Sequence, residues 1–321
     1  MKNSCPTPCD VEMASLLVED LVASADRLAV LLDYDGTLVD ITTDPRDARP
    51  DDDLLALLDA LSRRRSVTVH LVSGRPRATM EDWFGSLPLG LHAEHGLWSR
   101  WGGTWSRRTA APAAWFEALR SVLETVTARV PGAALEVKTE SYAWHHRLAD
   151  PAATPAAEQL IRQAAVAAGD DVEVLRGHQV LELRRRGVDK GCVVRDIASA
   201  AVERTAYLAM GDDTTDEDMF AALPLPSLAL RIGPGATCAQ HRLGGPVDVR
   251  AILRAIACRP GSTLSPRSGC SPPTGRRSRS SRPRSRPVIS CSCSGSSPAS
   301  ASSSASSTRT GGDKNRRIAR G

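Results

Sequence analysis

Two aspartates, Asp33 and Asp35, stand directly after the apolar stretch 28–32. Period two along a strand sends both side chains toward the same side. A third carboxylate, Asp212, follows another apolar stretch, 206–210. Such a group of like charges is unfavourable unless a cation balances it, and Mg²⁺ with oxygen ligands suits a site that also holds a phosphate. The sequence therefore predicts a metal site built from residues far apart in the chain.

Other polar residues beside apolar stretches are suited to binding a phosphate. Ser73 and Gly74 follow the stretch 67–72 and offer a hydroxyl and an unencumbered backbone amide near a helix start. Lys190 precedes an apolar helical pattern and supplies an ammonium. Open parallel sheets bind ligands at the carboxyl ends of their strands, so we expect these groups to meet the carboxylates in one crevice.

The elements that must position these residues alternate between strands and helices. Strands are expected over 28–32 and 67–72, with a helix over 51–64 between them. The pattern returns later with a helix near 190–202, a strand over 206–210, a helix over 215–222, a strand over 227–232 and a helix over 247–257. Continuous apolar strands separated by amphipathic helices predict an α/β fold with a Rossmann-like parallel sheet covered on both faces.

The middle of the chain has a different pattern. The stretches 134–148 and 172–184 alternate with period two, and Gly177 and His178 mark a hairpin turn in the second. A helix rich in Ala and Gln lies between them. We interpret this region as an inserted α+β cap domain. The predicted divisions are a helical lead-in over 1–26, a core over 27–107 and 188–258, a cap over 108–187 and a tail over 259–321.

The charge is divided unevenly along the chain. The net charge of +4 combines 12 Lys and Arg against one acid in residues 262–321 with 29 against 36 in residues 1–261. Ser, Pro, Gly and Arg dominate the tail, which predicts disorder. It can be a nucleic-acid-binding tract, a passive extension, or the product of a reading-frame slip after residue 258. We favour the latter two, because no aromatic residue is present to stack a base.

Several classes of protein are not expected. No run of about 18 apolar residues appears and the first residues lack the order of a signal peptide, so we expect a cytoplasmic protein without a membrane partner. The eight cysteines match neither a zinc site nor a disulfide framework, and we expect free thiols. His70 and His92 lie inside apolar runs and are expected to be buried. Trp98, Trp101 and Trp105 are expected to pack where core and cap meet.

Four segments resemble, in order, the motifs of the haloacid-dehalogenase superfamily of aspartate-nucleophile phosphatases: DYDGTLVD, SGR, GVDKG and GDDTTDE. Taken alone, D-x-D-G is typical of a turn and Ser73 of a helix N-cap, but their order is specific to the superfamily. Outside these motifs, the chain is similar to trehalose-6-phosphate phosphatases from about residue 27 to 258, in the segments DPRDARP, HAEHGLW, LEVKTESYAWHHR and GHQVLELR.

This resemblance implies a mechanism and a phosphate site. Asp33 would be the nucleophile that forms an aspartyl phosphate, and Asp35 the general acid and base. Ser73, Gly74 and Lys190 would bind the phosphate. The implied activity is Mg²⁺-dependent hydrolysis of trehalose 6-phosphate.

The resemblance also implies the ligands of the metal. Mg²⁺ would be held by the Asp33 carboxylate, the main-chain carbonyl of Asp35 and the Asp212 carboxylate. Either Asp213 or Asp216 would orient ligands or waters. The metal would offset the repulsion between these carboxylates and a phosphate dianion.

The cap would select the sugar. The residues that would contact sugar hydroxyls are Lys138, Arg147 and Glu182 from the cap and Arg75, Glu94 and His95 from the core. Two positions depart from the family pattern: His146 stands where Tyr is usual and Gln179 where Lys is common.

We expect a monomeric enzyme whose small-molecule partner is a sugar phosphate. Two alternatives to the hydrolysis of trehalose 6-phosphate stay open. One is a phosphatase for sucrose 6-phosphate or a mannosyl phosphoglycerate. The other is a nucleic-acid-binding protein with a basic tail and a degenerate phosphatase core.

Overall fold

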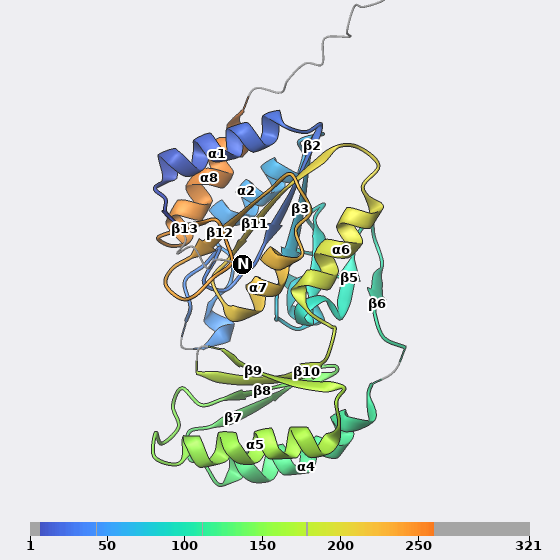
Figure 1. Cartoon of the computed structure of the whole chain (residues 1–321), viewed down its shortest axis with the longest axis vertical. Helices are drawn as coiled ribbons and strands as arrows, with labels where there is room; N and C mark the ends of the chain where they lie inside the picture. Colours follow the sequence, from blue (N-terminus) through green and yellow to red (C-terminus); the bar gives the residue numbers. More distant parts are fainter. Residues whose placement is uncertain (1–6, 43, 111, 178, 260–321) are drawn as a thin grey trace, which may run out of the picture. The chain divides into compact units, whose positions relative to one another are not determined.

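The apolar stretches form a large sheet in the computed structural model, which describes residues 7–42, 44–110, 112–177 and 179–259. Its central strands run parallel in the order β12-β11-β2-β3. They are β2 (Arg27–Leu32), β3 (Val67–Val72), β11 (Thr205–Gly211) and β12 (Ser227–Ile232). Four predicted strands are therefore confirmed, and their carboxyl ends share one edge of the sheet (Figure 1).

Shorter strands extend the sheet on both sides. Within the described residues the full order is β1-β13-β12-β11-β2-β3-β4-β5-β6. The added strands are β1 (Thr7–Pro8), β4 (Gly90–Ala93), β5 (Trp98–Arg100), β6 (Trp105–Arg107) and β13 (His241–Leu243). β5 and β6 pair antiparallel, so the sheet is mixed at this edge, a feature that the sequence did not predict.

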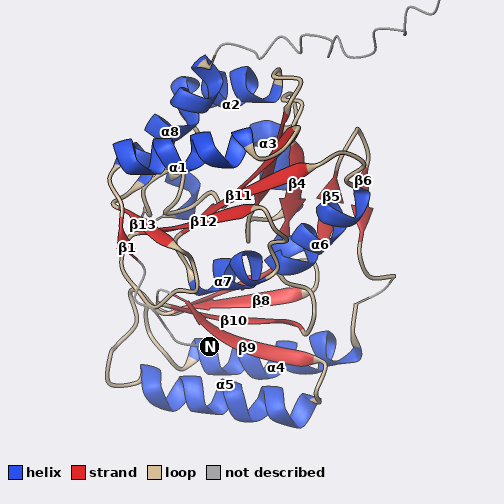
Figure 2. Cartoon of the chain, turned by 45° about the horizontal axis from the view of Figure 1, so that its top comes forward, coloured by secondary structure: helices blue, strands red, loops and turns tan. Residues whose placement is uncertain are grey.

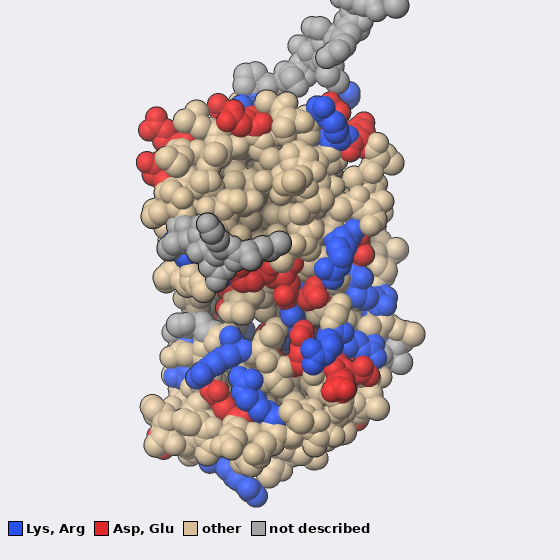
Figure 3. All heavy atoms as spheres, in the orientation of Figure 1, with Lys and Arg blue, Asp and Glu red and all other residues tan. Residues whose placement is uncertain are grey.

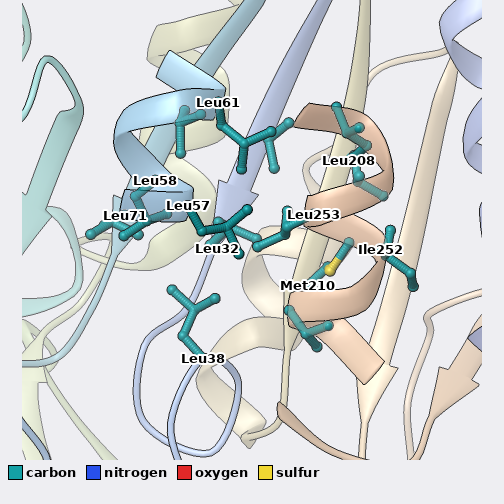
Figure 4. Packing of buried hydrophobic residues seen from close by; sticks show 14 of the residues in the cluster. Leu32, Leu38, Leu57, Leu58, Leu61, Leu71, Leu208, Met210, Ile252 and Leu253 are labelled. Atoms are coloured by element: carbon teal, nitrogen blue, oxygen red, sulfur yellow. The ribbon is translucent and has the colours of Figure 1, made fainter. Parts of the chain in front are cut away.

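Helices cover both faces of this sheet because its strands bury side chains alternately on the two sides. Leu28, Val30 and Leu32 pack with α1 (Val11–Ala23), α2 (Asp52–Ser62), α3 (Arg77–Phe84) and α8 (Pro246–Cys258). Figure 4 shows Leu57, Leu58 and Leu61 of α2 and Leu253 of α8 in this cluster. Ala29 and Leu31 pack with α6 (Lys190–Ala200) and α7 (Thr214–Ala221) on the other face. We call this sheet and its helices the core.

A second sheet, antiparallel and in the order β7-β8-β10-β9, follows β6 in the chain. Its elements are β7 (Ala134–Val137), β8 (Ser141–His145), β9 (Val172–Gly177) and β10 (Val180–Arg185), covered by α4 (Ala114–Ala128) and α5 (Thr154–Ala168) (Figure 2). The buried side chains of Trp144, Leu181 and Leu183 pack against the two helices. We call this unit the cap.

The stretch 134–148 is a hairpin of two strands. Lys138 donates its backbone N–H to the Ser141 carbonyl at 2.9 Å and closes the turn. Because the turn residues Lys-Thr-Glu include neither Gly nor Pro, the sequence carries no signal for it. The second stretch forms the expected hairpin after Gly177, while His178 lies outside the described residues.

The structure confirms the α/β fold class with an inserted α+β cap, and the exact domain boundaries stay a prediction. His70 and His92 are buried as expected, and Cys9, Cys192, Cys238 and Cys258 are free. No helix within the described residues combines the length and apolarity needed to cross a membrane. The predicted disordered tail lies outside the described residues, except for Arg259.

Candidate active site

Three carboxylates gather at the carboxyl ends of two neighbouring strands. Asp33 follows β2, Asp212 follows β11, and Asp216 lies in the first turn of α7. One oxygen atom from each lies within 4.8 Å of the others. The pairing of Leu32 with Met210 fixes the register of the two strands, so it also fixes the proximity of Asp33 and Asp212. We call these three residues the carboxylate cluster.

Lys190 lies against this cluster because Asp189 caps α6. The Asp189 side chain accepts a hydrogen bond from the Cys192 amide at 2.7 Å, which makes Lys190 the first residue of the helix. The buried Nζ of Lys190 lies 2.6 Å from Asp33 Oδ1 and 2.7 Å from Asp216 Oδ1. Burial opposes the charge on this ammonium, but Asp216 and Asp33 outweigh that effect and raise the pKa of Lys190.

A single ammonium does not balance three carboxylates. Burial and the nearby charge of Asp216 raise the pKa of Asp33 well above its usual value. The same two causes raise the pKa of Asp212 to about 6. This excess of negative charge and an all-oxygen set of donors fit a divalent cation.

Gly36 lets the loop after β2 pass directly over Asp212. Its φ of 78° is a left-handed conformation, and a Cβ atom there would lie 2.1 Å from Asp212 Oδ2. The next residue, Thr37, donates its hydroxyl to Asp212 Oδ1 at 3.2 Å. The sequence reasoning gave Thr37 no role, although it belongs to the quoted motif DYDGT.

The Asp35 side chain lies outside the carboxylate cluster, in an ion pair with Arg75. The guanidinium donates from Nε to Oδ2 at 2.8 Å and from Nη2 to Oδ1 at 2.6 Å. Arg75 also lies over the ring of Trp83, 4.5 Å from its centroid. Arg75 was predicted to contact the sugar, and in this structure it holds the candidate acid and base.

Asp213 and Asp216 have different positions. Asp213 is the N-cap of α7 and donates its backbone N–H to Asp216 Oδ2 at 2.9 Å. Only Asp216 belongs to the carboxylate cluster. Between the two candidates that the sequence left open, the geometry thus favours Asp216.

Ser73 and Gly74 leave β3 beside the end of β2. Ser73 is buried, and its Oγ accepts a hydrogen bond from the Arg75 amide at 3.2 Å. A Cβ at position 74 would lie 2.7 Å from the imidazole of His95, so only glycine fits without displacing that ring.

Four predicted sugar contacts meet where core and cap join. Glu94 and His95 lie in a tight turn with φ values of 50° and 57°. Glu94 accepts hydrogen bonds from the amide and hydroxyl of Thr139 at 2.8 and 2.7 Å. His95 Nε2 lies 3.1 Å from Glu182 Oε2, and Lys138 Nζ lies 3.4 Å from Glu182 Oε1.

Lys138 and Glu182 stabilise each other's charged form, whereas burial lowers the pKa of His95. Burial opposes ionisation of Glu182, but His95 and Lys138 outweigh it and hold the pKa of Glu182 well below its usual value. Trp98 donates from Nε1 to Thr139 Oγ1 at 3.2 Å, so it packs where core and cap meet, as predicted. Thr139 is a contact that the sequence reasoning missed.

Arg147 lies elsewhere on the cap. It donates from Nη1 to the Thr42 carbonyl of the core at 2.8 Å and from Nε to Gln179 Oε1 at 3.1 Å. Within the described residues it makes no hydrogen bond or ion pair with Lys138 or Glu182.

A largely parallel core with carboxylates at its strand ends and an inserted cap is the arrangement expected from the resemblance of the sequence to the haloacid-dehalogenase phosphatases. The profile of the trehalose-phosphatase family matches residues 31–229. The chain belongs to this family.

Two individual relatives that are similar to this chain carry names of the same family. The chain is 37% identical over 258 residues to a bifunctional trehalose-6-phosphate synthase/phosphatase of Thermoproteus tenax, covering 77% of this chain and 35% of that protein. It is 34% identical over 211 residues to a trehalose-phosphatase of Schizosaccharomyces pombe, covering 63% of this chain and 26% of that protein. The chain thus spans about a third or less of these relatives.

This chain also matches a solved structure over nearly the full length of that structure. The C-terminal domain of trehalose-6-phosphate phosphatase from Candida albicans superposes with a TM-score of 0.71 at 28% identity. The match covers 80% of this chain and 99% of that domain.

Proposed function

We propose that this chain is a Mg²⁺-dependent phosphatase that hydrolyses trehalose 6-phosphate to trehalose and inorganic phosphate. The observation that carries the proposal is the carboxylate cluster at the strand ends with Lys190 against it. Lys138 and Glu182, which meet His95 where core and cap join, supply polar groups for a sugar. Membership of the trehalose-phosphatase family supports the choice of sugar.

The first step transfers the phosphoryl group to the protein. A carboxylate oxygen of Asp33 attacks phosphorus, and the bond between phosphorus and the sugar oxygen breaks. Asp35 gives its proton to the departing oxygen, so the sugar leaves as a neutral alcohol. Lys190 neutralises charge on the phosphoryl oxygens from its position beside Asp33.

The second step returns the protein to its starting state. Asp35, now a carboxylate, takes a proton from a water molecule that attacks phosphorus. The bond between phosphorus and Asp33 breaks, releasing inorganic phosphate. In the absence of substrate Arg75 donates hydrogen bonds to both oxygens of Asp35. We infer that this contact opens when substrate binds, because Asp35 must take up a proton from solvent before it can serve as the acid of the first step.

The residues that would hold the metal are Asp33, Asp212 and Asp216, with the main-chain carbonyl of Asp35. When bound, Mg²⁺ supplies positive charge that reduces the repulsion between the cluster and a phosphate dianion. The raised pKa values of Asp33 and Asp212 support this assignment, because they report a charge imbalance that a cation removes.

The test is phosphate release from trehalose 6-phosphate, sucrose 6-phosphate, a mannosyl phosphoglycerate and glucose 6-phosphate, each with Mg²⁺ and with excess chelator. We expect turnover of trehalose 6-phosphate that requires Mg²⁺ and exceeds that of the other three. Equal turnover of all four would refute the sugar assignment, and undiminished turnover in chelator would refute the metal.

A further inference from the structure

The strand β10 presents two charged side chains to the core. Glu182 and Arg184 lie two residues apart, so both point to the same face of the cap sheet. Leu181 and Leu183 point the other way, into the apolar cluster between this sheet and the cap helices. Glu182 Oε2 lies 3.1 Å from His95 Nε2, in the group of residues expected to contact the sugar. The position of β10 relative to the core therefore decides where this part of the sugar site lies.

Arg184 binds one carboxylate of the cap and one of the core. Its Nε donates to Glu173 Oε1 at 2.6 Å, and its Nη2 donates to Asp218 Oδ2 at 2.7 Å. Glu173 is the residue directly opposite Arg184 on β9, so it holds the guanidinium in a fixed direction. Asp218 belongs to α7 of the core. Only 5% of Arg184 is exposed, so water screens these two contacts weakly.

The helix that Arg184 contacts lies along the hairpin of β9 and β10. At the other end of this hairpin, a Cβ atom at Gly177 would lie 3.2 Å from Asp213 Oδ2, so the end of β9 reaches the N-cap of α7. Figure 3 shows acidic and basic side chains together where α7 meets the cap sheet. The hairpin thus contacts α7 near both of its own ends.

The same helix carries Asp216 of the carboxylate cluster, two residues before Asp218. Its position is fixed by α6: a Cβ atom at Gly191 would lie 2.4 Å from the main-chain oxygen of Asp218, too close for any side chain. Lys190, the first residue of α6, donates to Asp216 Oδ1 at 2.7 Å. Arg184 therefore joins β10 to a helix that is held firmly in the core and that carries a candidate metal ligand.

We propose that Arg184 is a positioning residue that makes the site selective for a phosphorylated sugar over a small phosphate ester. Its ion pair with Asp218 keeps β10, and with it Glu182, at a constant distance from the carboxylate cluster. A sugar phosphate has to reach both places at once, with its phosphate at the cluster and its hydroxyls at Glu182. A small ester without hydroxyls needs only the groups of the core. This inference rests on the function proposed above.

The test compares two substrates in the full chain with Mg²⁺: trehalose 6-phosphate, and p-nitrophenyl phosphate, which has no sugar hydroxyl. Arg184→Gln should lower kcat/KM for trehalose 6-phosphate about tenfold or more, because small misplacements of binding groups reduce this quantity strongly. The loss should lie in KM, since hydroxyl contacts are made in the bound substrate and in the transition state alike. The kcat/KM for p-nitrophenyl phosphate should stay unchanged.

A second variant breaks the same ion pair from the core. Asp218→Asn changes a side chain that is 39% exposed, so it tests the contact even where Arg184→Gln destabilises the chain, and it should reproduce the selective loss. The double variant should lose no more than either single variant, because both remove one shared interaction. Arg176→Gln is the matched control: it breaks an ion pair with Glu158 on the helix-facing side of the cap sheet and should leave both substrates unchanged.

Failure of the proposed function and failure of this inference give different results. A wild type that hydrolyses p-nitrophenyl phosphate but not trehalose 6-phosphate would refute the sugar assignment, and the variants are then compared on the sugar phosphate that the wild type hydrolyses fastest. An equal loss for both substrates in Arg184→Gln and Asp218→Asn, or no loss in either variant, would overturn the role of Arg184 alone. A wild type without phosphatase activity would overturn both.

Discussion

The side chain of Asp33 is buried, yet the role of nucleophile proposed for it needs the charged carboxylate. It is 5% exposed, and its Oδ1 is bound to Lys190 at 2.6 Å. Two further carboxylates lie within reach of it. Lys190 stabilises the charge that a nucleophile needs, while burial and Asp216 oppose it. We infer that this balance makes the carboxylate dependent on a cation for full ionisation.

Asp33→Asn should lower phosphate release by about a thousandfold or more, because an amide cannot form the covalent intermediate. The chain should stay folded, since the side chain keeps its shape. Turnover of trehalose 6-phosphate and the thermal unfolding curve are the measurements. Asp40→Asn, at an exposed position on the same segment, is the control and should behave as wild type. Substantial activity in the Asp33→Asn variant would place the nucleophile elsewhere.

At the scale of elements, β3 and β4 carry a buried pair of histidines. His70 Nδ1 and His92 Nε2 lie 3.1 Å apart, and His92 Nδ1 lies 2.9 Å from Ser99 Oγ on β5. Burial lowers the pKa of His70 to about 4. The folded chain therefore keeps this imidazole neutral at pH values where the unfolded chain protonates it.

This difference predicts a loss of stability in acid. The unfolded pKa is near 6.5, so the contribution of His70 is complete above that value and decreases as the pH falls toward about 4. Between about pH 7.5 and pH 5 we expect His70 alone to remove about 2 kcal/mol from the free energy of unfolding.

The measurement is urea unfolding at both pH values for the wild type and His70→Asn. The variant should lose less stability than the wild type over this interval. Gln163→Asn, at an exposed position of the cap without a titratable group, is the control and should keep the wild-type pH dependence. Identical pH dependence in the His70 variant would show that its imidazole is not the responsible group.

Glu140 joins the two segments that connect core and cap. Its side chain is 1% exposed and lies within 3.2 Å of Arg107 on one connection and of Arg185 at the end of β10. It also accepts hydrogen bonds from the Thr109 hydroxyl and the Ala113 amide, both at 2.7 Å. A single buried carboxylate thus fixes the start and the end of the cap.

Glu140→Gln should lower the free energy of unfolding by about 1–3 kcal/mol, because two arginines lose their counter-charge. Denaturant unfolding at neutral pH is the measurement. Glu117→Gln removes an exposed carboxylate beside Arg120 and should change stability by less than about 0.5 kcal/mol. Equal stability of the two variants would contradict the importance of the Glu140 contacts.

For the molecule as a whole, the candidate active-site residues all lie between positions 33 and 216, and the family profile ends at residue 229. The basic segment 262–321 contributes none of them. Core and cap contact each other through Glu94 with Thr139, His95 with Glu182, and Arg147 with Thr42.

Deleting residues 262–321 should leave the kcat and KM for trehalose 6-phosphate unchanged. The comparison needs the full chain as control, with both proteins also tested for retention of RNA and DNA at low and high salt. A loss of turnover in the shortened chain would contradict this prediction. Salt-dependent nucleic-acid binding that disappears with the tail would favour the nucleic-acid-binding alternative.

Much of the core could be predicted because its signals are local. The apolar stretches ending before Asp33, Ser73 and Asp212 predict buried strands, and a parallel sheet brings their carboxyl ends to one edge. The antiparallel strands β5 and β6 were missed because each has only three residues. The hairpin turn at 138–140 was missed because it lacks Gly and Pro.

The sequence by itself determined that Asp33, Asp212 and Ser73 lie at the ends of strands that share one edge of the sheet, because apolar strand patterns and parallel order can be predicted from local segments of the chain. Only the tertiary structure decided how the side chains there pair: Asp35 with Arg75, Lys190 with both Asp33 and Asp216, and Asp216 in place of Asp213 in the cluster. These pairings depend on distances between loops and helix ends that are far apart in the chain. No residue pattern encodes such distances, because they follow from the packing of α6 and α7 on the sheet.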